Sequence, residues 1–404
     1  MNKQQEPRLR FKGFTGAWEE KKLEDIFNTI RNAFVGTATP YYVENGHFYL
    51  ESNNIKNGEI NKNSQIFIND EFYYKQQDKW LKTNDLVMVQ SGHVGHCAVI
   101  PEELNNVAAH ALIMFSNYKS EANPYFLSYQ FQTNSKINEI AKITTGNTIK
   151  HILSSDMKEF VVDFPMVEEQ TQLGNFFRRL DSQIAESRAV LEKSRQLKKA
   201  MLAKMFPANG EKIPEIRFKG FEGEWEEKNF ESVGEFNPKT EIPSIFQYVD
   251  LESVVGTQLI SYREESKETA PSRAQRLAKN GDLFFQAVRP YQKNNYLFEK
   301  NNENFVFSTG YIQIRPQNDG YFLLTLVQKE EFVQEVLLRC TGTSYPAINA
   351  SSLQDIAILT PQTSKEQIAI GNFFRQLDET IALQTAEVEK LNQLKKGLLA
   401  AMLV

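Results

Sequence analysis

The stretch "IRFKGFEGEWEEK" at residues 216–228 nearly repeats "LRFKGFTGAWEEK" at residues 9–21. A second phrase also occurs twice, as "EEQTQLGNFFRRLDSQIA" at 168–185 and as "KEQIAIGNFFRQLDETIA" at 365–382. Because the two phrases keep their order in each half, the chain contains an internal duplication, which decides how the fold is interpreted. Each half of the chain therefore has the same order of segments: an aromatic lead-in, a body of variable sequence, a proline and then a long tail that we predict to be helical.

The variable bodies, roughly residues 23–163 and 230–359, share short landmarks although they have little direct identity. Because repeated phrases enclose two bodies of different sequence, we predict two copies of one domain, each adapted to a different target. The alternative is a duplicated structural domain without functional content. Three landmark pairs correspond, the first of which places Asp85 over Asp282: "KTNDLVMVQSG" (82–92) with "AKNGDLFFQAV" (278–288), "TTGNT" (144–148) with "CTGTS" (340–344), and "YLESNNIKNG" (49–58) with "YVDLESVVGT" (248–257).

We predict an α/β (α+β) fold for the bodies. Helical spacing of apolar residues predicts helices within 123–133 and 320–338. Short apolar runs predict buried strands, and two runs that stop at a proline predict edge or exit strands. The predicted strands are 85–89, 282–288, 160–165 and 356–361.

The two tails carry the clearest periodic signal, because their apolar residues alternate in steps of three and four. The first tail stops at "FPANG" (206–210), a proline and glycine stop signal. A helix of about 35 residues is roughly 50 Å long and, with one apolar seam, needs a partner. We expect the tails to pack together as a coiled coil. The predicted seam residues are Phe177, Leu180, Ile184, Leu191, Phe374, Leu377, Ile381, Val388, Leu391 and Leu398.

These signals divide the chain into four parts, separated where each body gives way to a helical tail. The predicted parts are the first body with its lead-in at 1–165, a central helix at 166–206, the second body with the repeated lead-in at 207–362, and a C-terminal helix at 363–404.

The composition favours a cytoplasmic protein. No apolar run approaches the ~18 residues of a membrane span, and the polar start "MNKQQEPRLRFKGF" lacks an apolar signal core. Two cysteines in 404 residues, Cys97 and Cys340, argue against a disulfide framework and fit a reducing compartment.

Catalytic and metal-binding motifs are missing from the sequence. There is no phosphate-binding G-x-x-x-x-G-K-[ST] loop, no H-E-x-x-H and no G-x-S-x-G. The cluster "HVGHC" (93–97) lacks the second half of a four-ligand zinc site. We therefore expect a non-catalytic chain without a metal of its own.

The loops that follow the buried strands, and the two Gly-Thr loops, are rich in groups that can recognise nucleic acid. Arg and Lys pair with guanine, Asn and Gln pair with adenine, and Thr, Ser and backbone N–H groups suit phosphate. Such residues also fill ordinary surface loops. The candidate DNA-binding residues are Gln90, Ser91, His93, His96, Thr145, Asn147, Thr148, Lys150 and His151 in the first body, and Gln286, Arg289, Tyr291, Lys293, Asn294, Asn295, Thr341, Thr343, Ser344 and Tyr345 in the second.

The charge balance constrains this interpretation. Residues 40–150 contain 9 Lys or Arg against 11 Asp or Glu, and residues 235–360 contain 12 against 15. A DNA-binding protein gains much of its affinity by neutralising phosphates. We therefore expect the basic residues to be gathered on one face and another subunit to supply further positive charge.

With two bodies, each set between the "RFKGF…W-E-E-K" and "E-Q…G-N-F-F-R-x-L-D" phrases, the chain resembles over essentially its whole length the specificity subunit of type I restriction–modification systems. The resemblance implies that each body is a target recognition domain for one half of a split DNA sequence. It also implies that the tails pack antiparallel and set the gap between the half-sites.

The same resemblance implies partners and cofactors outside this chain. Two modification (methyltransferase) subunits would carry S-adenosylmethionine and methylate adenine. Restriction subunits would use ATP and Mg²⁺ to translocate and cleave DNA. Two other hypotheses remain: a self-contained DNA endonuclease with an unrecognised site, and a coiled-coil adaptor that never contacts DNA.

Overall fold

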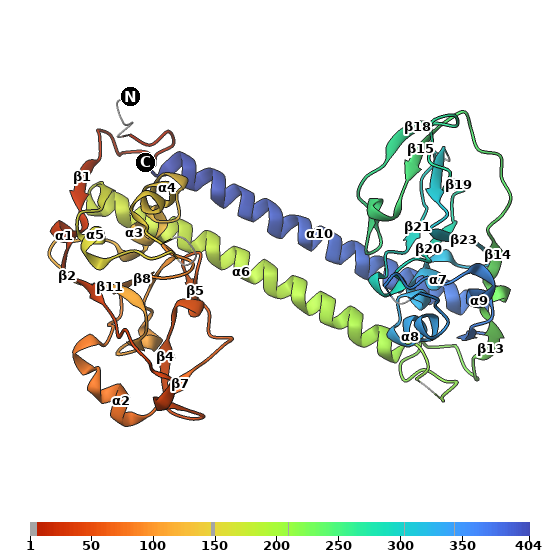
Figure 1. The fold of residues 1–404 in the computed structure, drawn as a ribbon, viewed down its shortest axis with the longest axis horizontal. Helices are drawn as coiled ribbons and strands as arrows, with labels where there is room; N and C mark the ends of the chain where they lie inside the picture. Colours follow the sequence, from red (N-terminus) through yellow and green to blue (C-terminus); the bar gives the residue numbers. More distant parts are fainter. Residues whose placement is uncertain (1–5, 147–149, 209, 303, 343) are drawn as a thin grey trace. The chain divides into compact units, whose positions relative to one another are not determined.

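The computed structural model describes residues 6–146, 150–208, 210–302, 304–342 and 344–404. The chain forms two compact units. Unit 1 comprises Met1–Arg188 and Glu387–Val404, and unit 2 comprises Ala189–Ala386. Figure 1 shows the two units by the colours of their segments, with the end of α10 in unit 1.

Unit 1 contains two four-stranded sheets, with the orders β2-β11-β8-β9 and β10-β4-β7-β3, together with the pairs β1-β12 and β5-β6. Its elements are β1 (Glu19–Lys22), α1 (Leu23–Ile26), β2 (Phe27–Asn32), β3 (Tyr42–Val43), β4 (His47–Leu50), β5 (Ile55–Lys56), β6 (Glu59–Ile60), β7 (Phe67–Ile68), α2 (Asp70–Lys75), β8 (Leu86–Val89), β9 (Cys97–Val99), β10 (Ala108–Ala109), β11 (Leu112–Tyr118), α3 (Pro124–Gln130), α4 (Asn134–Ile143), α5 (Ser154–Lys158), β12 (Val161–Phe164) and the start of α6 (Val167–Lys204).

Unit 2 has the sheets β14-β23-β20-β21 and β18-β15-β22-β19 and the pairs β13-β24 and β16-β17. Its elements are β13 (Glu226–Asn229), β14 (Gly234–Phe236), β15 (Ile245–Val249), β16 (Val254–Val255), β17 (Gln258–Leu259), β18 (Arg263–Ser266), β19 (Ala274–Leu277), β20 (Leu283–Gln286), β21 (Tyr296–Leu297), β22 (Phe305–Ser308), β23 (Tyr311–Pro316), α7 (Gly320–Val327), α8 (Glu330–Leu338), α9 (Ala350–Gln354), β24 (Ala357–Thr360) and the start of α10 (Ser364–Met402).

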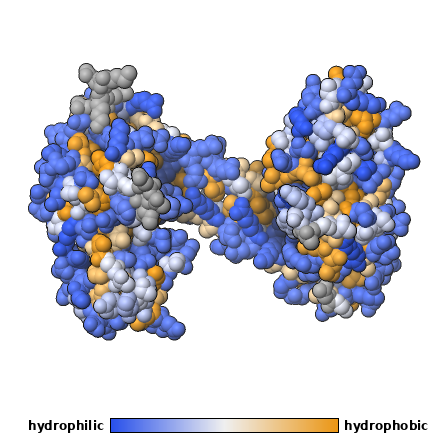
Figure 2. Space-filling model, in the orientation of Figure 1, coloured by the Kyte–Doolittle hydropathy of each residue, from blue (hydrophilic) through white to orange (hydrophobic). Residues whose placement is uncertain are grey.

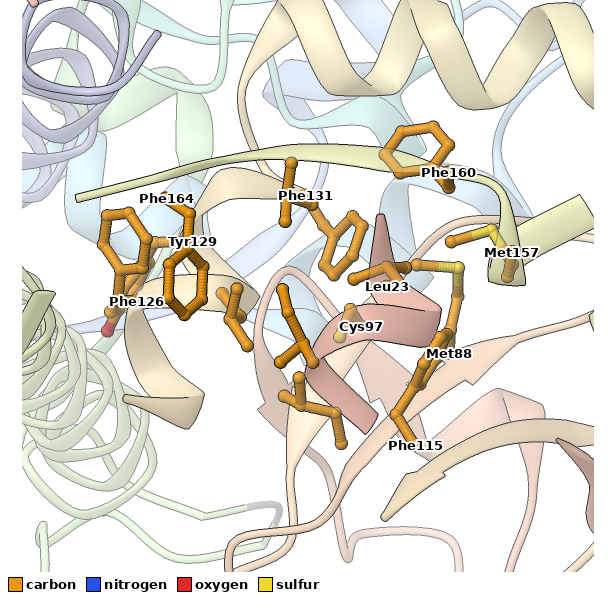
Figure 3. Packing of buried hydrophobic residues seen from close by; sticks show 14 of the residues in the cluster. Leu23, Met88, Cys97, Phe115, Phe126, Tyr129, Phe131, Met157, Phe160 and Phe164 are labelled. Atoms are coloured by element: carbon orange, nitrogen blue, oxygen red, sulfur yellow. The ribbon is translucent and has the colours of Figure 1, made fainter. Parts of the chain in front are cut away.

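The central strand β8 buries both of its faces, as its unbroken apolar run predicts. Leu86 and Met88 belong to one hydrophobic cluster, and Val87 and Val89 belong to a second cluster on the opposite face. Figure 3 shows part of the first cluster, where Leu23 of α1 packs beside Met88. Strand β20 divides its side chains between two clusters of unit 2 in the same way.

The segment 320–338, whose apolar spacing predicted helical structure, forms two helices, α7 and α8. The break falls at Lys329, whose backbone is extended. The Lys329 ammonium is mostly buried and donates to the Pro207 carbonyl at 3.4 Å. The apolar periodicity continues across the break, because both helices bury a face in the same cluster. The sequence pattern therefore could not locate the turn.

The repeated lead-ins hold the start of each long helix by a two-pronged ion pair. Arg10 donates from Nε and Nη2 to both carboxylate oxygens of Glu169 at 2.7 and 2.8 Å. Arg217 and Glu366 repeat this geometry with the same two distances in unit 2. The glutamate side chains are only 1% and 3% exposed. We call each pair a clasp.

Each lead-in also bonds the end of the other long helix. The Leu9 amide donates to the Ala401 carbonyl of α10 at 2.8 Å, and the Ile216 amide donates to the Lys204 carbonyl of α6 at 2.9 Å. These carbonyls belong to the last turns, where no intrahelical donor remains. Each unit therefore holds the beginning of one long helix and the end of the other.

The glycine of the repeated phrase "GNFF" has a packing role. A Cβ atom on Gly174 would overlap the Asn123 side chain, and a Cβ atom on Gly371 would overlap the Asp319 side chain. These polar residues cap α3 and α7. The glycines thus allow each long helix to approach the capped end of a body helix closely.

Within each unit the two long helices run antiparallel. In unit 1, Asp181 pairs with Lys395 at 2.6 Å and Arg188 donates to Asn392 at 3.0 Å, so numbers rise along α6 as they fall along α10. Of the predicted seam residues, five are buried and five are half-buried. The buried residues are Phe177, Leu180, Ile184, Leu191 and Phe374, and the half-buried ones are Leu377, Ile381, Val388, Leu391 and Leu398.

No helix in the described part of the chain is both long enough and apolar enough to cross a membrane.

The landmark aspartates occupy the same turn in both units but have different surroundings. Asp85 accepts from the Lys82 amide at 2.7 Å, and burial raises the pKa of this carboxyl to about 6. Asp282 accepts from the Lys279 amide at 2.8 Å and also from Arg315 at 2.9 and 3.0 Å. The strand registers place Ser116 of β11 where β23 has Arg315, so Asp85 lacks a matching cation.

We predict that Asp85→Asn stabilises unit 1 at neutral pH. The folded-state pKa lies above the ordinary value, so the carboxylate becomes destabilising as the pH rises from about 4 through 6, by about 1–3 kcal/mol. Urea unfolding at pH 4.5 and pH 7.5 measures this change. Asp282→Asn is the matched control, and it should destabilise unit 2 at pH 7.5 because it removes the buried carboxylate that pairs with Arg315 at 2.9 Å. Equal effects of the two substitutions would contradict the account.

Candidate nucleic-acid interface

Two loops that are distant in the sequence lie side by side in unit 1. One loop follows β8 and the other follows α4. The Gly92 amide donates to the Lys150 carbonyl at 3.1 Å, which joins the loops. Thr145 and His151 exchange backbone hydrogen bonds of 2.9 and 2.8 Å, which closes the second loop. The structure thus brings together two sets of predicted residues that the sequence separates.

Unit 2 repeats this arrangement bond for bond. The Arg289 amide donates to the Pro346 carbonyl at 2.8 Å, and Thr341 and Ala347 exchange bonds of 2.9 and 3.0 Å. Arg289 therefore occupies the position that Gly92 has in unit 1. The backbone frame is the same in both units, while the side chains on it differ.

A β-hairpin completes the surface in each unit. In unit 1 the Asn57 amide, in the turn of β5-β6, donates to His96 Nδ1 at 3.3 Å. In unit 2 the Gly256 amide, in the turn of β16-β17, donates to Asn294 Oδ1 at 2.8 Å. We call the hairpin and the two loops the loop surface of each unit. Its described parts lie within 55–60, 90–96 and 144–151 in unit 1, and within 254–259, 287–295 and 341–347 in unit 2.

Most candidate residues of unit 1 are accessible on its loop surface. Two of them, Asn147 and Thr148, lie outside the described residues. The exposed candidates are His93, Thr145, Lys150 and His151, and the half-buried ones are Gln90, Ser91 and His96.

The candidates of unit 2 divide more sharply. Gln286 is 1% exposed, donates to Gln292 Oε1 at 2.8 Å and accepts from the Asn294 amide at 3.1 Å. Asn295 is also buried and accepts from the Gln286 amide at 2.8 Å. These two amides were expected to face DNA, but in the structure they shape the loop. Thr343 lies outside the described residues; the exposed candidates are Tyr291, Thr341, Ser344 and Tyr345, and the half-buried ones are Arg289, Lys293 and Asn294.

Lys293 has partners within the protein. Its ammonium donates to Glu330 at 2.8 Å and to the Gln328 carbonyl at 3.1 Å, both at the α7–α8 junction. This side chain therefore anchors the loop to the helices below it. Sequence analysis had placed it among the DNA contacts.

Sequence analysis missed the hairpins and a cationic groove. The hairpins lie at the repeated landmarks 49–58 and 248–257, but nothing in these sequences indicated that the hairpins contact the loops after β8 and β20. In unit 1 a groove of about 1160 Å³ lies between the β5-β6 hairpin, the loop after β8, helix α4, the middle of α6 and the last part of α10. Lys56, Arg188 and Lys396 line it, together with acidic Glu59 and the Asp181 carboxylate that pairs with Lys395.

The described residues contain no cluster of three metal-ligating side chains that could hold an ion. The rings of His93 and His96, from the "HVGHC" stretch, lie 6.2 Å apart, and Cys97 is buried beneath them in β9.

Figure 2 shows that hydrophilic residues dominate the drawn faces of both units.

Comparison with known proteins identifies a family. A sequence model of the type I restriction modification DNA specificity domain matches residues 16–193 and again residues 222–393. The MjaVIII specificity subunit of Methanocaldococcus jannaschii is 20% identical over 429 residues, which cover 96% of this chain and 92% of that protein. The EcoBI specificity subunit of Escherichia coli is 23% identical over 194 residues, which cover 47% of this chain and 41% of that protein.

Two solved structures have a similar fold. The S subunit of the type I restriction–modification system of M. genitalium aligns with a TM-score of 0.65, 15% identity and 99% coverage of both chains. A chain from a structure of type I restriction–modification complex assembly aligns with a TM-score of 0.51, 16% identity and coverage of 95% of this chain and 96% of that one. These matches confirm the predicted α/β fold with its internal repeat.

The hairpin contacts predict a difference in pH dependence between the units. Burial, His93 and Lys56 lower the pKa of His96 below its ordinary value of 6.5, so Nδ1 is a neutral acceptor at pH 7. Protonation below that pKa removes the acceptor for the Asn57 amide. In unit 2 the acceptor for the Gly256 amide is the side-chain oxygen of Asn294, which does not titrate.

We therefore expect the amide protection factor of Asn57 to fall severalfold between pH 7.5 and pH 5, because one hydrogen bond contributes about 1 kcal/mol. The protection factor of Gly256 should stay constant over the same range. Hydrogen exchange followed by NMR measures both amides in one sample. Parallel changes at the two amides, or no change at either, would contradict the assignment.

Proposed function

This chain belongs to the type I restriction modification DNA specificity family, and from that premise we propose that each of its units recognises one half of a two-part DNA target. The observation that carries the proposal is the duplicated loop surface. Gly92 and Arg289 hold the same backbone position, and so do Thr145 and Thr341. A shared set of backbone hydrogen bonds that carries different side chains is what two recognition sites for two different half-sites require.

The chemistry of the loop surfaces supports DNA as the ligand. Exposed Thr and Ser hydroxyls suit phosphate oxygens, and the histidine, arginine and amide groups suit base edges. The two surfaces differ in their hydrogen-bonding groups, since His93, His96 and His151 lie on the loop surface of unit 1 and unit 2 has no histidine. Different donor sets predict different half-site sequences.

We propose that this chain directs catalysis by other subunits and carries out none itself. Two modification subunits would bind S-adenosylmethionine and methylate adenine, and restriction subunits would bind ATP and Mg²⁺. The net charge of −5 supports this division, because a DNA complex needs more positive charge than this chain holds. The proteins with related sequences are specificity subunits by name.

The long helices are suited to fix the separation of the half-sites. Helix α6 has 38 residues and α10 has 39, so each is about 57 Å long. Each begins in one unit and ends in the other. The clasps hold the helix starts, so a change in helix length should be transmitted to the spacing of the target.

A body exchange tests the proposed function. Residues 23–163 are replaced by the corresponding body of a family member with a known target, and methylated adenines are mapped in a host that lacks the chain. We expect one half of the methylated sequence to change and the other half to stay. An unchanged sequence would favour the coiled-coil adaptor, and DNA cleavage by the purified chain alone would favour the endonuclease.

We further predict that inserting seven residues into each long helix lengthens the tolerated spacer by about three base pairs. One heptad preserves the seam and adds about 10 Å, and ten base pairs of DNA span about 34 Å. The methylation map of the insertion variant measures the spacer. An unchanged spacer would show that the helices do not set it.

A further inference from the structure

The two loop surfaces differ at a strained backbone position. Gly92 in unit 1 has φ +80°, and Arg289, which makes the equivalent hydrogen bond in unit 2, has φ +55°. Gly95 has φ +89°, and Lys293 has φ +56° one residue before the hairpin contact of unit 2. Where unit 1 uses two glycines, unit 2 therefore uses two cations.

Long side chains rarely adopt this conformation, because Cβ crowds the neighbouring carbonyl in the left-handed region. Apart from these two cations, the non-glycine residues with positive φ in the described part of the chain are asparagines and Ala111. Asparagine tolerates the conformation through local hydrogen bonds. An arginine there needs a compensating role.

A role within the fold accounts for Lys293 but not for Arg289. Lys293 bonds Glu330 and the Gln328 carbonyl, as described above. The Arg289 guanidinium instead lies over the ring of Tyr345, 4.3 Å from its centroid. Among the described residues, no carboxylate or carbonyl accepts a hydrogen bond from it. Tyr345 is itself 63% exposed, so the pair stands at the surface.

Stacking on a tyrosine ring orients a guanidinium while it leaves the donor edge free. A planar donor fork of this kind matches the O6 and N7 acceptors of guanine in the major groove. An arginine fork can also bind a phosphate. The two contacts are separated by sequence selectivity, because a phosphate contact carries no base information and a guanine contact does.

We propose that Arg289, oriented by Tyr345, is a specificity-determining residue of unit 2 and recognises a guanine in its half-site. This inference rests on the proposed function of the loop surfaces. Tyr345 is a positioning residue, because it acts on the base through Arg289. Unit 1 has Gly92 at the same position and does not recognise a base from there.

The test uses the complex of this chain with its modification subunits and a DNA library in which both half-sites are randomised. The key variant is Arg289→Gly, which restores the residue type of unit 1. We expect it to lose about tenfold to hundredfold of its discrimination at one guanine of the unit 2 half-site, with the unit 1 half-site unchanged. Its thermal unfolding temperature should be equal to or higher than that of wild type, because the strain is relieved.

Three further variants sharpen the result. Arg289→Lys keeps the charge but loses the fork, so it should also lose guanine discrimination. Tyr345→Ala should reduce discrimination at the same base partially, while Tyr345→Phe should retain it because the ring remains. Lys293→Gly is the matched control, and it should lower the unfolding temperature without selective loss at one base.

Several outcomes would overturn the inference. A uniform loss of methylation across all sequences, with rescue by Arg289→Lys, would make Arg289 a phosphate contact. A lower unfolding temperature with an unchanged target would make it structural. A wild-type complex that shows no two-part target would instead overturn the proposed function, which keeps the two failures distinct.

Discussion

The pairing of a buried glutamate with an arginine from the lead-in is the interaction on which both units depend. Glu169 and Glu366 are almost fully buried, so their charges require the guanidinium forks of Arg10 and Arg217. Each lead-in that supplies the arginine also bonds the last turn of the other long helix. One short segment thus joins two helix ends in each unit, and a chain with two such units must contain the segment twice. The repetition of the sequence phrase follows from this requirement.

The clasp leaves the body free to vary. In each unit the strand at the end of the lead-in pairs with the strand before the proline, as β1 with β12 and β13 with β24. The body therefore begins and ends at one two-stranded sheet beside the clasp. Strands β8 and β20, buried on both faces, support the loops that follow them. A constant base with variable loops lets one fold recognise different sequences, which is the property that a specificity subunit needs.

Sequence analysis predicted the features that depend on local patterns or on the repeat. The fold class, the strands ending at prolines and the alignment of Asp85 with Asp282 follow from composition, periodicity and duplication. The features that it missed depend on contacts between distant residues. The turn at Lys329 is hidden by an apolar pattern that continues across it, and the contacts of the hairpins with the loops join segments about forty residues apart. Burial of Gln286 was also missed, because a glutamine after an apolar strand is equally compatible with an exposed position. The left-handed backbone of Arg289 has no sequence signal at all, since arginine ordinarily avoids it.

The clasp is tested most directly by a double-mutant cycle in unit 1, with urea unfolding of Arg10→Met, Glu169→Met and the double variant. The account predicts that each single substitution costs about 3–5 kcal/mol, because it leaves a buried charge unpaired, and that the double substitution costs much less than the sum. The same cycle on Arg217 and Glu366 should give a similar coupling in unit 2. Small and additive effects in both cycles would contradict the claim that the clasps hold the units together.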